Sequence, residues 1–158
     1  MAVRINRKDT LEVLKGILEQ NADKRIVVVG TTCAGKSTLI AQLKADGFNA
    51  QDMDELLVSR LSKSERDAVN QTPWTTEIGE LMEGLAKSHI GIAAGEPVFG
   101  TVVFDCDLLV YLKVSDDKLR ERIRDRGVKF EDAKNMQERI EEKIRASRIR
   151  CIEIAIGA

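Results

Sequence analysis

The chain of 158 residues has the size of one globular domain, and its 43% hydrophobic and 32% charged residues exclude a disordered chain. A formal net charge of −1 gives no general attraction to nucleic acid or to an anionic membrane. No apolar run approaches the roughly 20 residues that span a membrane, and the N-terminal residues lack the apolar core of a signal peptide. We therefore expect one domain over 1–158 in the cytoplasm, with neither nucleic acid nor a membrane as its partner.

The hydrophobic pattern of the first half of the chain predicts helices that alternate with strands. Leucines at helical spacing predict an amphipathic helix over 8–20, within an extra N-terminal helical segment over 1–22. The β-branched run 26–29 does not alternate with polar residues, which is typical of a strand buried on both faces. After it we expect a loop over 30–37, a helix over 38–45, a weak strand over 48–51 and a helix over 55–63.

The second half begins with a polar segment, 64–76, that is predicted to be mostly loop. Trp74 in this loop either stacks on a substrate ring or anchors the loop to the core. Strands that alternate with helices are typical of parallel βαβ units, so the sequence predicts an α/β fold with a parallel sheet. The remaining elements are expected as helices over 77–87, 116–126 and 131–147 and as strands over 89–94, 108–114 and 151–156.

One segment matches the phosphate-binding pattern G-x-x-x-x-G-K-[ST] without a mismatch, between a buried strand and a helix. Its glycines permit the backbone turns, and the backbone N–H groups and the positive helix end attract an anion. Lys36 reaches the β- and γ-phosphates, and the Ser37 hydroxyl ligates Mg²⁺. The predicted nucleotide-binding residues are Gly30, Thr31, Thr32, Cys33, Ala34, Gly35, Lys36, Ser37 and Thr38.

The cysteines and the single histidine exclude several other kinds of site. Cys33, Cys106 and Cys151 show no C-x-x-C spacing, which favours reduced thiols over a disulfide framework or a zinc site. Cys33 is either a reactive thiol near a helix start or a small residue that fits the loop. His89 alone disfavours a His-based metal centre and a serine-type triad.

The sequence also disfavours a guanine-nucleotide switch, because D-x-x-G, N-K-x-D and T-K-x-D are absent from it. Three segments together resemble small-molecule kinases of the P-loop NTPase class, the shikimate, gluconate and nucleoside-monophosphate kinase group. These segments are the phosphate loop, Asp52-Met53-Asp54 after the second strand, and 108–127, a strand and a helix that ends in R-x-x-x-R-G. The resemblance implies a three-layer P-loop NTPase fold with a five-stranded parallel sheet and helices on both faces.

The resemblance also implies roles for individual residues. It places Asp52 on the Mg²⁺ side and Asp54 at the acceptor hydroxyl, which a carboxylate can orient and deprotonate. It places Arg122 and Arg126 at the start of a mobile lid over about 125–135, where arginines stabilise phosphate charge. Arg139 is a further candidate for a phosphate contact.

Each of these assignments has an alternative that the sequence leaves open. Asp54 can be the N-cap of a solvated helix. Asp105, after an apolar run, competes with Asp52 for the metal. Arg122 and Arg126 can form a solvated basic face paired with Glu121 and Asp125.

The motif and the resemblance together predict ATP- and Mg²⁺-dependent phosphoryl transfer to a small-molecule hydroxyl or phosphate acceptor, by a monomer or homodimer. Lys36, Asp54, Arg122 and Arg126 are the predicted catalytic residues, and Ser37 and Asp52 the predicted metal ligands. Residues 64–76 and 95–106 are expected to shape the acceptor pocket. The alternative is a P-loop ATPase or nucleotide-dependent switch that acts on a partner protein.

Overall fold

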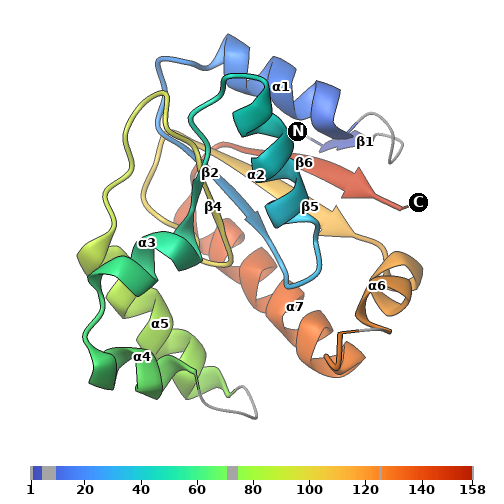
Figure 1. Cartoon of the computed structure of the whole chain (residues 1–158). Helices are drawn as coiled ribbons and strands as arrows, with labels where there is room; N and C mark the ends of the chain where they lie inside the picture. Colours follow the sequence, from blue (N-terminus) through green and yellow to red (C-terminus); the bar gives the residue numbers. More distant parts are fainter. Residues whose placement is uncertain (1, 5–9, 71–74, 125, 158) are drawn as a thin grey trace.

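The computed structural model describes residues 2–4, 10–70, 75–124 and 126–157 (Figure 1). Pro73, Trp74 and Asp125 lie outside the described residues, so the interpretations of Trp74 and Asp125 stay predictions. The elements are β1 (Ala2–Arg4), α1 (Thr10–Gln20), β2 (Ile26–Gly30), α2 (Lys36–Ala45), β3 (Gln51–Asp52), α3 (Met53–Arg60), α4 (Lys63–Val69), α5 (Thr76–His89), β4 (Val98–Gly100), β5 (Leu108–Val114), α6 (Asp116–Ile123), α7 (Phe130–Ser147) and β6 (Cys151–Ile156).

The sheet is parallel throughout, with the strand order β1-β6-β5-β2-β4-β3. β2 is the central strand that precedes the phosphate loop, and Val28 pairs with Val110 of β5 and with Phe99 of β4. All five residues of β2 are buried, as its unbroken apolar run predicts. The predicted α/β fold is therefore confirmed, with five strands from β6 to β3 and β1 as a sixth at the edge.

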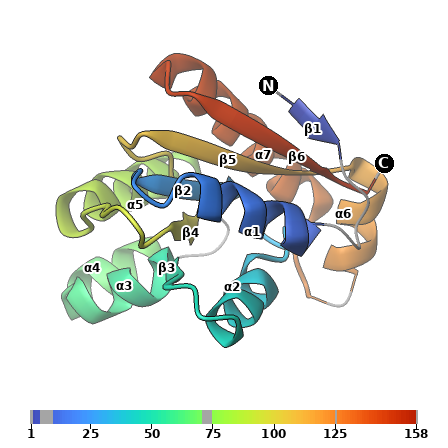
Figure 2. The same ribbon diagram turned by 90° about the horizontal axis from the view of Figure 1, so that it is seen from above.

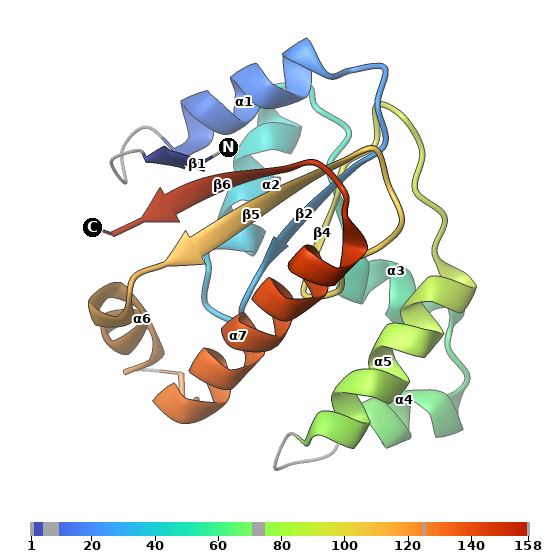
Figure 3. The same cartoon turned by 180° about the vertical axis from the view of Figure 1, so that it is seen from behind.

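Helices cover both faces of the sheet, which gives the molecule two apolar layers (Figure 2). Side chains of β2 alternate between them: Ile26 and Val28 pack towards α1, α2 and α6, whereas Val27 and Val29 pack towards α3, α5 and α7. Helices α3, α4 and α5 also form a group beside the sheet, seen from both sides in Figures 1 and 3, which we call the helical lobe. The lobe consists of α3–α5 without the undescribed residues 71–74.

Several predicted boundaries are wrong. Residues 89–94 are not a strand: α5 continues to His89, and the third strand of the core is β4, which begins directly after Pro97. The strand predicted over 48–51 is β3, shifted to Gln51–Asp52. The segment 64–76 contains all of the helix α4 except its first residue, Lys63, and the N-terminal segment 1–22 contains β1 as well as a helix. None of the helices in the described ranges is long and apolar enough to cross a membrane.

Candidate nucleotide-binding site

The phosphate loop connects β2 to α2 and depends on both of its glycines. Gly35 has a φ of 89°, in the left-handed region that favours glycine, and it is the residue from which α2 begins. At Gly30 a Cβ atom would lie only 3.0 Å from the Ala34 Cβ and 3.3 Å from the Leu112 Cβ. Within the described part of the chain no side chain caps α2, so its first N–H groups face the loop. The loop therefore has the geometry that binds an anion at a helix start.

The loop is held in place by α7, which packs behind it. The fully buried Thr31 hydroxyl donates to the Ala133 carbonyl at 2.8 Å. The Thr32 N–H donates to the Met136 sulfur at 3.4 Å. The Thr31 side chain therefore anchors the loop and faces away from the phosphate side.

Cys33 is a non-glycine residue with a φ of 65°. The left-handed conformation costs an L-residue free energy, so the surrounding loop must impose it. The side chain is buried at 8% exposure, which favours the interpretation as a small residue that fits the loop. Arg122 donates from Nη1 to the Cys33 carbonyl at 3.1 Å and lies next to Gly35.

Lys36 folds back over its own loop. Its Nζ donates to the carbonyl oxygens of Gly30 and Thr31, each at 2.7 Å. Burial lowers the pKa of Lys36 to about 8, against the attraction of Asp54 and Asp52. The Lys36 ammonium group therefore lies at the phosphate loop, where it is bonded to backbone oxygens of the loop itself.

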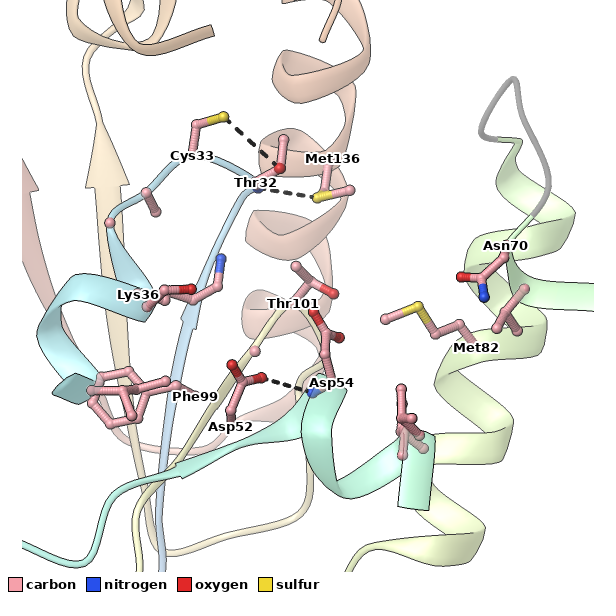
Figure 4. A pocket seen from close by; sticks show the side chains of 18 of the residues that line it. Thr32, Cys33, Lys36, Asp52, Asp54, Asn70, Met82, Phe99, Thr101 and Met136 are labelled. Atoms are coloured by element: carbon pink, nitrogen blue, oxygen red, sulfur yellow. Dashed lines mark hydrogen bonds between the residues drawn. The ribbon is translucent and has the colours of Figure 1, made fainter. Parts of the chain in front are cut away.

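The two carboxylates of Asp52-Met53-Asp54 lie at the junction of β3 and α3. Asp52 is the N-cap of α3 and accepts a hydrogen bond of 2.8 Å from the Asp54 N–H, so the alternative that made Asp54 the cap is wrong. Burial and the neighbouring Asp52 raise the pKa of Asp54, while Lys36 acts to lower it. Both carboxylates line the cavity that Lys36 lines (Figure 4).

The two arginines predicted for the lid differ in their surroundings. Arg122 is half-buried against the phosphate loop through its contact with Cys33, whereas Arg126 is exposed and lines the cavity. The helix predicted over 116–126 ends earlier, because α6 stops at Ile123. The end of the predicted lid, from Phe130, is the first turn of α7. The alternative interpretation, a solvated basic face, therefore fits Arg126 better than it fits Arg122.

Two other sequence candidates lie away from the loop. Asp105 interacts with Arg25, which precedes β2, so it lies at the opposite end of that strand from the phosphate loop. Arg139 of α7 donates to Glu83 of α5 at 3.1 Å. The structure therefore keeps Asp52, and not Asp105, beside Lys36.

The cavity has a volume of about 480 Å³ and extends from the phosphate loop to the helical lobe. At the loop it is polar, and towards the lobe its wall is mostly apolar (Figure 4). Seven of the nine predicted loop residues line it, all except Gly30 and Thr31. The lobe contributes Leu57, Val58, Leu61, Arg66, Val69, Asn70 and Met82.

Arg66 and Asn70 are the polar groups of this wall that sequence reasoning missed. Both belong to α4 and its C-cap, four residues apart and therefore on one helix face. The signal was present as Ser62-x-x-Glu65: Ser62 accepts from the Glu65 N–H at 3.2 Å and donates its own N–H to Glu65 at 2.9 Å. Such a capping box predicts a helix start in the segment that was expected to be loop.

The match to a family model agrees with the class that the fold and the loop define, a P-loop NTPase. Residues 25–122 match a family model described as an AAA domain, AAA_28, and the chain belongs to this family. The matched range contains the phosphate loop, both aspartates and Arg122.

A search of solved structures found similarity to TT1252 from Thermus thermophilus, with 17% identity, a TM-score of 0.47, and 81% of this chain and 86% of that chain covered. Another is the YorR protein from Bacillus subtilis in complex with phosphorylated GDP, with 14% identity and a TM-score of 0.41. That match covers 81% of this chain and 83% of the YorR chain. A comparison with curated proteins found no significant match.

Proposed function

We propose that the protein is a kinase that transfers the γ-phosphoryl group of ATP, with Mg²⁺, to a small-molecule acceptor. The observation that carries this proposal is the continuous cavity from the phosphate loop, past Asp54, to the apolar wall of the lobe. Its volume of about 480 Å³ falls in the range of small-molecule sites, and its far part is lined by the lobe and not by the phosphate loop.

On the donor side, the loop N–H groups and Lys36 bind the β- and γ-phosphates. Lys36 then exchanges the carbonyl oxygens of Gly30 and Thr31 for phosphate oxygens, while Arg122 adds positive charge from above the loop. Among the described residues no group of three or more Asp, Glu, His or Cys residues forms a metal site. The hydroxyl of Ser37 and the carboxylate of Asp52 suit Mg²⁺, which proteins bind through few side chains plus phosphate oxygens. The ion would neutralise charge that develops on the phosphates.

On the acceptor side, Asp54 orients a hydroxyl group and receives its proton. The acceptor oxygen forms a bond to the γ-phosphorus as the bond from that phosphorus to the β-phosphate oxygen breaks, and ADP leaves. The raised pKa of Asp54 improves it as a proton acceptor near neutral pH. Arg66 and Asn70 hold the far end of the acceptor, and the apolar wall excludes water.

The proposal is tested by ADP formation from ATP or GTP and Mg²⁺ with a panel of nucleosides, nucleoside monophosphates, hydroxy acids and polyols. We expect one acceptor class to raise turnover, and Asp54→Asn to lower the stimulated rate by roughly 100-fold or more. Asp105→Asn is the matched control, because it removes an aspartate near Arg25 and should leave the rate unchanged. If no acceptor changes the rate of ATP hydrolysis, the kinase proposal is overturned and the alternative of an ATPase or switch is supported.

A further inference from the structure

A cluster of charged side chains joins the helical lobe to α7. Glu83 of α5 lies at its centre, with a side chain that is only 14% exposed. Arg139 of α7 donates to Glu83 at 3.1 Å, and the Lys143 Nζ lies 3.6 Å from the same carboxylate oxygen. A cavity of about 30 Å³ lies between α5 and α7 beside these groups. The cluster therefore links two helices beside a small cavity that they line together with residues 101–103.

The α7 end of this link is fixed to the core. Gln137 is buried at 1% exposure, and its side chain both accepts from the Val114 N–H and donates to the Val114 carbonyl, each at 3.3 Å. Ala133, one turn before Gln137, and Met136, the residue directly before it, hold the phosphate loop through Thr31 and Thr32. Since α7 contacts the end of β5, the phosphate loop and the lobe from successive turns, it connects the two ends of the cavity.

We propose that the Glu83–Arg139 ion pair is a positioning device that fixes the helical lobe against α7 and so sets the separation between the lobe wall and the phosphate loop. The inference rests on the proposed function, because this separation matters when an acceptor on the lobe must meet a phosphate on the loop. Reacting atoms must approach to about 3–3.5 Å, and a misplacement of about 1 Å can cost roughly 100-fold in rate. Arg139 is thus a positioning residue and not a phosphate ligand.

The cluster contains its own control. The Lys87 Nζ lies 2.9 Å from Glu83, but Lys87 belongs to α5 itself, one turn away. Lys87 therefore adds positive charge next to the carboxylate without linking two helices. If Glu83 positions the lobe, substitution of Arg139 impairs the protein and substitution of Lys87 does not. If Glu83 only balances local charge, both substitutions have an effect.

The test compares Arg139→Gln, Arg139→Lys, Glu83→Gln and Lys87→Gln in the full chain. We expect Arg139→Gln and Glu83→Gln each to lower kcat for acceptor phosphorylation by about tenfold or more while the KM for ATP stays within about twofold. Arg139→Lys, which keeps the charge, should restore most of the rate, and Lys87→Gln should match the unmodified protein. A raised KM for ATP in Arg139→Gln alone would mean a phosphate contact, and equal effects of Lys87→Gln and Glu83→Gln would mean charge balance; either result overturns the proposal.

Hydrogen exchange provides a readout that needs no turnover. In Glu83→Gln and Arg139→Gln the amides of α3 and α5 should exchange faster, while those of β2 and β5 stay unchanged. Unchanged exchange in α5 would overturn the positioning role even if the protein is a kinase. If the amides of α5 exchange faster but no acceptor is ever phosphorylated, the link between the lobe and α7 is supported and the proposed function is rejected.

Discussion

The affinity for ATP is expected to fall as the pH rises above about 8, because Lys36 binds phosphates only as a cation. Burial lowers the pKa of Lys36 from 10.5 to about 8, and its Nζ donates to two carbonyl oxygens at 2.7 Å. A bound triphosphate stabilises the ammonium form, so binding above this pKa requires the uptake of one proton. Well below its pKa Lys36 is fully protonated and the affinity for ATP is complete. The affinity is lost as the pH rises through this pKa.

The magnitude follows from the cationic fraction of Lys36. For a pKa of about 8, this fraction falls about 25-fold between pH 7.5 and 9.5, which is about 2 kcal/mol of binding free energy. Phosphate groups lose their last proton near pH 6, so this window isolates the lysine. The affinity loss is expected to approach this factor, because the bound phosphates raise the pKa in the complex.

The assay is isothermal titration of a non-hydrolysable ATP analogue with Mg²⁺ at constant ionic strength across this pH window. Titration in buffers of different ionisation enthalpy reports the proton uptake directly. Lys36→Arg is the matched control, because its guanidinium stays charged and its affinity should not depend on pH. Affinity that is constant to pH 9.5 in the unmodified protein, or the same decline in Lys36→Arg, would refute the role of Lys36 titration.

Substitutions at three positions test individual contacts. Gly35→Ala places a Cβ at a φ of 89° and 3.4 Å from Arg122 Nη1, so thermal unfolding should show a loss of about 1–2 kcal/mol, and an unchanged midpoint would reject the strain. Thr31→Val removes the bond to Ala133 and should cost about 1 kcal/mol in denaturant unfolding, whereas Thr31→Ser should retain it. Burial disfavours the Glu83 carboxylate, but three neighbouring cations outweigh burial and lower its pKa below 4.5. The stability from these pairs is therefore complete above about pH 4.5 and lost as the pH falls through the lowered pKa, and Glu83→Gln should remove that part of the stability profile.

The parts of the fold that the sequence predicted well are those with strong local patterns. The buried run of β2, the glycine loop and the long apolar stripe of α7 each carry their signal within one element. β4 has only three residues, and its burial depends on pairing with β2 and β3, which lie far away in the sequence. The apolar run within residues 89–94 is longer than β4, and the strand was therefore predicted there.

The residues of the candidate site likewise fall into those that a local sequence pattern predicts and those that it does not. Lys36, Ser37 and the two aspartates follow from short motifs whose spacing fixes their geometry. The Glu83–Arg139 pair joins residues 56 positions apart, and the lobe wall comes from three helices, so neither is visible in a local pattern. The capping box at Ser62 was a local signal that indicated α4, but it did not indicate that Arg66 would line the cavity.

The most direct test of the proposed kinase is transfer of label from [γ-³²P]ATP to an acceptor in a single turnover. We expect the labelled phosphoryl group on the acceptor with ADP as co-product, transfer lost in Lys36→Ala and Asp54→Asn, and transfer retained in Asp105→Asn. Label that appears only as inorganic phosphate with every acceptor class, at a rate that Asp54→Asn leaves unchanged, would contradict phosphoryl transfer through Asp54.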